Sequence, residues 1–161
     1  MAKFPLTPRG QKALRDELKN LREVQRPKNV QDIEEARAHG DLRENAEFHA
    51  AKEKQAFIEG RSREIDSILA QAEIIDPGKL SGERVVFGAT VKLTDTDSGD
   101  EMTYSIVGDY EADIKLGRIA ISAPVARAMI GKDLGDTVTI RTAKGTREYQ
   151  IAEVRFEAQE E

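Results

Sequence analysis

Residues 38–45 read AHGDLREN and separate two long charged segments in which apolar residues recur at helical spacing. The stretch contains one glycine, Gly40, followed by two carboxylates three residues apart, Asp41 and Glu44. Two long helices joined by so short a break must fold back on each other as an αα-hairpin. We therefore predict that Asp41 and Glu44 lie at the tip of a helical rod, far from any core.

The segment before this break has the features of one long helix. Thr7 supplies a capping hydroxyl, and Pro8 follows at the first helical position. Pro27 should kink or restart the helix, because proline lacks a backbone N–H and crowds the preceding turn. The helix should end at Gly40. Its narrow apolar stripe, of the coiled-coil type, consists of Leu14, Leu18, Leu21, Val30, Ile33 and Ala36.

The second helix is predicted to begin near Leu42. Phe48, Ile68 and Leu69 widen its apolar face, and Gly60 is a weak point within it. This face is too narrow to bury much surface, so we predict a projecting antiparallel coiled coil. The face is built on residues at intervals of seven, namely Ala51, Ile58, Ile65 and Ala72.

The run EIIDPGK at residues 73–79 marks a change in structure, because the apolar period then falls from about 3.6 to about 2. Residues 124–131, PVARAMIG, predict one short helix with Ser122 as its cap and Gly131 as its stop. The strands are predicted at residues 85–87, 89–93, 102–107, 118–122, 137–141 and 148–154.

A small antiparallel sheet that packs on one helix makes an α+β domain. We therefore expect an α+β protein of two domains. Residues 1–76 form the coiled-coil hairpin with its acidic tip, and residues 77–161 form the sheet domain.

Composition excludes several classes of protein. The net charge is −5, which is unlike a binder that neutralises many phosphates, and 5% aromatic residues without tryptophan argue against a base-stacking platform. The absence of cysteine excludes disulfides and thiolate metal sites. No signal peptide and no long apolar run are present, so we expect a cytoplasmic protein without a membrane partner.

The acidic pair has two interpretations. Asp41 and Glu44 fit a capping box, with Asp41 at the N-cap and Glu44 reaching back from the third helical position. They also fit half of a divalent-metal site, because Mg²⁺ is usually held by one or two carboxylates together with water and phosphate oxygens. Two exposed carboxylates cannot hold the ion tightly, but they could complete a site that a partner half-builds at a phosphodiester.

The run from Gly40 to Gln55, GDLRENAEFHAAKEKQ, resembles the tip signature of the bacterial transcript-cleavage factors, the Gre family, of the GreA type. The resemblance extends over nearly the whole chain and both domains. It continues through residues 87–91, 106–109, 121–132 and 147–154.

This resemblance implies a factor that enters the secondary channel of backtracked bacterial RNA polymerase. There it stimulates the polymerase's own cleavage of the RNA 3′ end and is not an enzyme alone. Asp41 and Glu44 match the family's acidic pair, which is implied to share the second Mg²⁺ with the polymerase; the isolated protein is expected to bind no cofactor. Arg37, Lys52 and Phe48 match positions implied to contact the RNA 3′ segment, although family members often carry Tyr at position 48.

The second domain is similar to the family's FKBP-like domain, implied to grip the coiled coil at the channel rim, and we expect the factor to act as a monomer. An exposed apolar patch of Val125, Met129 and Ile130 is predicted to serve this docking or to pack against the hairpin. An isomerase activity is not expected, since few aromatic residues are available for an apolar pocket.

Interpretations without a functional role also fit several of these residues. Arg37, Arg43, Lys52 and Lys54 could form an ordinary solvated face, and His39 and His49 could be exposed helix-end residues. The acidic loop with Asp109, Glu111 and Asp113 lacks the EF-hand pattern and is interpreted as a turn. Two other functions stay open: a channel-plugging inhibitor without cleavage activity, and a chaperone-like interaction module.

Overall fold

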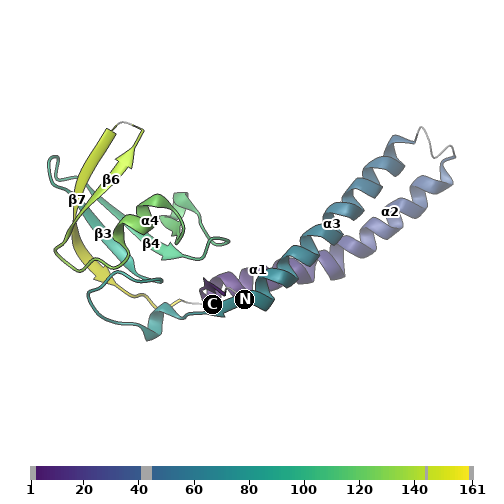
Figure 1. The fold of residues 1–161 in the computed structure, drawn as a ribbon. Helices are drawn as coiled ribbons and strands as arrows, with labels where there is room; N and C mark the ends of the chain where they lie inside the picture. The colour runs from purple at the N-terminus through teal and green to yellow at the C-terminus, as the bar shows by residue number, and fades with distance from the viewer. Residues whose placement is uncertain (1–2, 41–44, 144, 160–161) are drawn as a thin grey trace. The chain divides into compact units, whose positions relative to one another are not determined.

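The computed structural model describes residues 3–40, 45–143 and 145–159 (Figure 1). The chain divides into two compact units. We call Lys12–Gln71 the hairpin unit, and Met1–Gln11 together with Ala72–Glu161 the sheet unit. One unit is helical and the other is built on strands, which confirms the predicted α+β class.

The hairpin unit consists of two antiparallel helical arms. The first arm runs through α1 (Pro8–Asn20, which joins this unit from Lys12), the π-helical turn η1 (Leu21–Gln25) and α2 (Arg26–Ala38), and the second is α3 (Ala46–Gln71). Figure 1 shows α2 and α3 side by side. Among the described residues no helix is long and apolar enough to cross a membrane.

The π-helical turn changes which face of α2 is buried. The N–H of Arg26 donates to the carbonyl of Leu21, five residues back, and Pro27 then lies in the first turn of α2. A π-turn inserts one extra residue, which rotates the following helix by about 100°. Asn29 is therefore buried, with 2% exposure, whereas Val30 is 46% exposed. The prediction that Val30 continues the apolar stripe is wrong for this reason.

The rest of the predicted stripe is largely confirmed. The side chains of Ala51, Ile58 and Ile65 are buried at their seven-residue spacing, but Ala72 has left the helix and begins a strand. From the first arm Leu14, Leu21, Ile33 and Ala36 are buried. The seam between the arms is thus mostly apolar, as expected of a narrow coiled coil, but it also contains the buried polar side chains of Asn29 and Ser62.

Ion pairs flank this seam. Arg61 of α3 donates to both carboxylate oxygens of Glu17, at 2.6 and 2.8 Å, and Arg26 donates to both oxygens of Glu59, at 2.8 and 3.1 Å. The hydrogen bonds from Arg61 lower the pKa of Glu17, and the same pair raises the pKa of Arg61. Bidentate arginine–carboxylate pairs add geometric specificity, so they favour one register of the two arms.

The N-terminal residues belong to the sheet unit because of a short strand pair. Strand β1 (Phe4–Leu6) pairs in parallel with β2 (Ala72–Ile74), with Phe4 opposite Ala72. The amide of Ile75 also donates to the carbonyl of Leu6, at 2.9 Å. The N-terminal segment Met1–Gln11 therefore groups with the sheet unit, whereas a division at residue 76 would place it with the hairpin.

The main sheet has five strands in the order β5-β4-β3-β7-β6. It is mixed rather than wholly antiparallel as predicted, because β5 pairs in parallel with β4. A short 3₁₀ turn, η3 (Ile114–Leu116), precedes β5 and returns the chain to the same direction. The strands are β3 (Thr90–Asp95), β4 (Glu101–Val107), β5 (Arg118–Ala120), β6 (Thr137–Thr142) and β7 (Gly145–Arg155).

Two further predictions for this unit need correction. Residues 85–87 are not a strand; they follow an isolated bridge at Arg84, and the 3₁₀ turn η2 (Pro77–Lys79) lies earlier in the same connection between β2 and β3. The short helix is α4 (Pro124–Met129), and its N-cap residue is Ala123, without a side-chain cap. Ser122 instead donates its backbone N–H to Asp109, at 3.2 Å.

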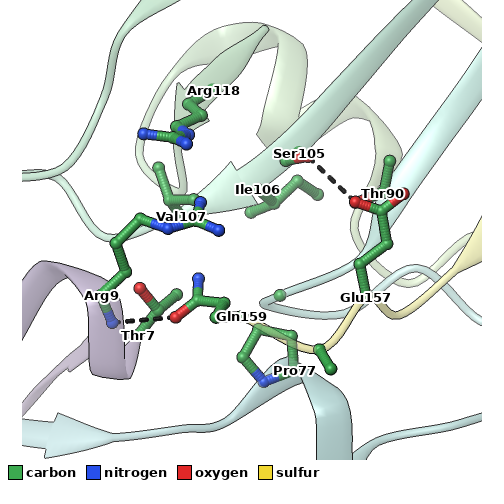
Figure 2. Close-up of a pocket in the computed structure, with 12 residues that line it drawn as sticks. Thr7, Arg9, Pro77, Thr90, Ser105, Ile106, Val107, Arg118, Glu157 and Gln159 are labelled. Atoms are coloured by element: carbon green, nitrogen blue, oxygen red, sulfur yellow. Dashed lines mark hydrogen bonds between the residues drawn. The ribbon is translucent and has the colours of Figure 1, made fainter. Parts of the chain in front are cut away.

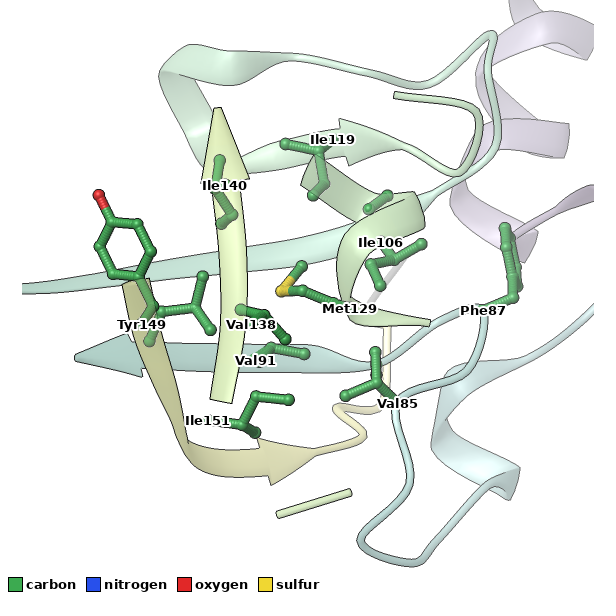
Figure 3. Packing of buried hydrophobic residues seen from close by; sticks show 13 residues of the cluster. Val85, Phe87, Val91, Ile106, Ile119, Met129, Val138, Ile140, Tyr149 and Ile151 are labelled. Carbon is green, nitrogen blue, oxygen red and sulfur yellow. The ribbon is translucent and has the colours of Figure 1, made fainter. Parts of the chain in front are cut away.

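The core of the sheet unit lies between the sheet and α4 (Figure 3). Met129 is fully buried there, with Val91, Ile106 and Val138 in the same cluster. The prediction that Met129 belongs to an exposed apolar patch is therefore wrong. Val125 and Ile130 are half-buried and pack against this core.

Glu111 ties the N-terminal segment to the loop after β4. Its carboxylate accepts hydrogen bonds from the backbone N–H and the hydroxyl of Thr7 and from the N–H of Gly108. Thr7 in turn caps α1, because its hydroxyl accepts the N–H of Gly10 at 3.2 Å. The acidic loop is thus a hydrogen-bonded turn, as interpreted, and Asp113 likewise accepts the N–H of Lys115.

Candidate functional site at the hairpin tip

The two predicted carboxylates lie outside the described residues. Asp41 and Glu44 fall in sequence between Gly40 and Asn45, where the structure resumes. The first arm ends in a tight turn, since the N–H of Gly40 donates to the carbonyl of Arg37 at 3.4 Å. Gly40 has a φ of 114°, a conformation that other residues rarely adopt. The glycine of the predicted break is therefore where the first helix stops.

Asn45 holds the two ends of the break together. Its side-chain oxygen accepts the N–H of Phe48 at 3.0 Å, which caps α3, and its side-chain amide donates to the carbonyl of Ala36 at 2.6 Å. The N-cap of α3 as the structure describes it is thus Asn45, whereas the predicted capping box of Asp41 and Glu44 lies outside the described residues. Sequence reasoning missed Asn45, although asparagine is among the preferred N-cap residues.

We expect Asn45→Ala to destabilise the hairpin by about 1–2 kcal/mol, because it removes an N-cap and leaves the Ala36 carbonyl without that donor. Asn45→Asp should lose less, since a carboxylate still caps the helix. Urea unfolding measures both, with Asn20→Ala as the control for an exposed asparagine. Equal stability of Asn45→Ala and the unchanged protein would show that this tie is not needed.

The predicted RNA-contacting residues surround this tie. Arg37 is exposed on α2, and among the described residues it has no carboxylate partner. Lys52 is exposed on α3 and donates to the side-chain oxygen of Gln55, at 2.8 Å. Phe48 is half-buried, and its ring meets that of His49 edge-on with centroids 6.0 Å apart. The structure thus brings all three positions to the last turns before the tip.

An open groove of about 380 Å³ runs between α2 and α3 beside the tip. Its apolar floor is made by the small side chains of Ala36, Ala50 and Ala51. Its charged rim is mainly acidic, which would repel a phosphate, and neither Arg37 nor Lys52 lines it. The polar lining residues are Asn29, Asp32, Glu35, His39, Glu47 and Lys54.

Within the described part of the chain, no group of three or more histidine, aspartate or glutamate side chains is placed to hold a metal ion. Asp32, on the groove rim, already accepts a hydrogen bond from Lys28 at 2.7 Å.

The two units define a class of protein that combines an antiparallel helical hairpin with a five-stranded mixed sheet. Residues 4–74 match the family model described as "Transcription elongation factor, N-terminal". Residues 80–156 match the one described as "Transcription elongation factor, GreA/GreB, C-term". The chain therefore belongs to the GreA/GreB family of transcription elongation factors, which confirms the resemblance seen in the sequence.

Two GreA relatives agree with this assignment. The chain is 55% identical over 157 residues to the transcription elongation factor GreA of Alkalilimnicola ehrlichii, covering 97% of this chain and 99% of the relative. It is 54% identical over 158 residues to GreA of Rickettsia canadensis, covering 98% of each. Among solved structures, GreA factor homolog 1 of Thermus thermophilus matches with 28% identity and a TM-score of 0.43, over 95% of this chain and 99% of that one.

Proposed function

We propose that this chain enters the secondary channel of backtracked bacterial RNA polymerase, hairpin tip first, and stimulates the polymerase's own Mg²⁺-dependent cleavage of the RNA 3′ end. Cleavage would release arrested complexes. The chain is not an enzyme alone, because it lends carboxylates to an active site that the polymerase owns. In this role the factor works as a monomer in the cytoplasm.

One observation supports the proposal. Asn45 at the start of α3 is hydrogen-bonded to Ala36 near the end of α2, and the short segment between Gly40 and Asn45 contains the acidic pair Asp41 and Glu44. Asn45 caps α3, and the first arm ends at Gly40. The cap of α3 is thus supplied by a residue outside the acidic pair. A pair of carboxylates at the end of two long helices is suited to delivering negative charge into a narrow space.

The donor set fits Mg²⁺, since carboxylate oxygens are the ligands this ion prefers, and the polymerase and RNA would supply the rest of the shell. The bound ion contributes charge stabilisation and an activated water for phosphodiester hydrolysis. Asp41 and Glu44 would orient that water. Arg37 and Lys52 would hold the displaced RNA by its phosphates, and Phe48 would contact a base with its ring.

The sheet unit is proposed to dock on the coiled coil at the channel rim. Met129 is buried in the core and cannot contribute to this contact. Val125 and Ile130 are half-buried, so they remain the candidates from the predicted patch. The aromatic residues Phe87 and Tyr149 are also buried in the core, which disfavours a second role as a prolyl isomerase.

A photo-crosslinking amino acid at position 48 tests the placement of the tip. In a backtracked polymerase complex with 3′-labelled RNA, we expect position 48 to crosslink to the displaced 3′ segment. The matched control is position 57, because Phe57 lies on the same helix and is 62% exposed. Crosslinking from position 57 but not from position 48, with a factor that still binds, would contradict the proposal.

A further inference from the structure

A small polar pocket lies in the sheet unit, far along the sequence from the acidic pair (Figure 2). Its volume is about 50 Å³, enough for a few water molecules or one phosphoryl group but not for a whole nucleotide. Arg9 enters it from the start of α1, and Arg118 enters it from β5. Ile106 and Val107 of β4 form its apolar wall.

The charge of this pocket is unbalanced. Among the described residues neither Arg9 nor Arg118 has a carboxylate partner for its guanidinium group. Glu157 also lines the pocket, but its carboxylate already accepts a hydrogen bond from Arg155 at 2.6 Å. The pocket therefore presents two guanidinium groups that form no ion pair with a described residue.

Neutral donors complete the lining. The hydroxyls of Thr90 and Ser105 lie 2.9 Å apart, and whichever one donates, the other keeps a hydrogen free to donate elsewhere. The side-chain oxygen of Gln159 accepts the backbone N–H of Arg9 at 2.9 Å. The side-chain NH₂ group of Gln159 therefore keeps two N–H donors. Figure 2 shows both of these hydrogen bonds at the edge of the pocket.

We propose that this pocket binds a phosphoryl oxyanion, held by Arg9 and Arg118. Guanidinium groups match the geometry of phosphate oxygens and form charge-assisted hydrogen bonds to them. The pocket's size favours a free phosphate or a terminal monoester over a phosphodiester inside a chain. The site is separate from the proposed cleavage role and does not rest on it.

Titration of the full-length protein with inorganic phosphate tests this site, followed by the amide resonances of Thr90 and Ser105. We expect saturable shifts at constant ionic strength. Arg9→Gln and Arg118→Gln should each weaken the apparent affinity by about tenfold, because each removes a charge-assisted hydrogen bond to the anion. Arg127→Gln is the matched control, since Arg127 is exposed on α4 and does not line the pocket.

Two further ligands identify the source of the phosphoryl group. A nucleoside monophosphate that shifts the same resonances would indicate a terminal monoester, whereas shifts with inorganic phosphate alone would indicate the free ion; either result supports the site. Equal shifts with acetate, no saturation, or the same affinity in both arginine variants and the control would overturn the proposal. Arg9 is exposed and Arg118 is half-buried, and an unchanged urea unfolding midpoint shows that each variant is folded.

Discussion

Asp41→Asn and Glu44→Gln should each reduce stimulated cleavage of the RNA 3′ end by about 10- to 100-fold, the range seen when a group that supports a metal site is removed. Each change keeps the size of the side chain and removes its charge. Binding to the polymerase should be unchanged, because the contacts of the sheet unit and of the two helical arms are intact. The measurement is the rate of RNA shortening in stalled complexes at saturating factor.

The dependence on Mg²⁺ separates this mechanism from a steric one. If the carboxylates share the ion, the Asp41→Asn variant should need a higher Mg²⁺ concentration and recover part of its activity there. Glu34→Gln is the matched control, since Glu34 is an exposed carboxylate on α2 of the same hairpin. It should retain full activity.

Full cleavage by both tip variants, with normal binding, would rule out the shared-ion role. A chain that binds and blocks the polymerase but never stimulates cleavage would instead be the channel-plugging inhibitor. Strong prolyl-peptide turnover that tip substitutions leave unchanged would favour the chaperone-like module. The same set of purified variants distinguishes these three functions.

Gly108→Ala should destabilise the sheet unit by about 1–3 kcal/mol or more, the usual effect of overpacking. A Cβ atom at position 108 would lie 2.5 Å from the carbonyl oxygen of Pro5 and 2.8 Å from a carboxylate oxygen of Glu111. The first is backbone and cannot rotate away. The N-terminal segment must therefore move, which weakens the pairing of β1 with β2.

Urea unfolding measures the loss of stability, and hydrogen exchange at Ile75 reports on the segment, because its amide is bonded to Leu6. Gly60→Ala is a second variant, for which we expect the opposite effect on stability. A Cβ at position 60 meets no atom within 4 Å, and alanine in a helix interior is favoured by about 0.5–1 kcal/mol, so this variant should be more stable. If Gly108→Ala unfolded at the same urea concentration as the unchanged protein, the close packing around Glu111 would not contribute to stability.

Local patterns predicted the helical hairpin well. The seven-residue spacing of Ala51, Ile58 and Ile65 indicated the buried face of α3, and Gly40 indicated the end of the first arm. These are properties of neighbouring residues on one helix, which the sequence contains directly. The π-turn η1 shifted the helical spacing of the buried residues by one. Val30 was therefore predicted to lie on the buried face of α2, which Asn29 occupies instead.

The site was predictable only in part. The acidic pair and its basic neighbours were visible as a motif, and the family resemblance suggested their roles. The cap at Asn45 was not predicted, because the spacing of Asp41 and Glu44 also suggested a cap nearby; the hydrogen bonds of Asn45 show that it caps α3.

The sequence by itself determined the two kinds of structure in this chain, the position of the break between the helices and the family to which the protein belongs. Periodicity, capping residues and motif order depend on residues close together in the chain, so they can be recognised from the sequence alone. The tertiary structure alone decided that β5 runs parallel to β4, that Met129 is core rather than surface, and that Glu111 binds Thr7 across more than a hundred residues. Those features depend on contacts between distant segments, which no local pattern records.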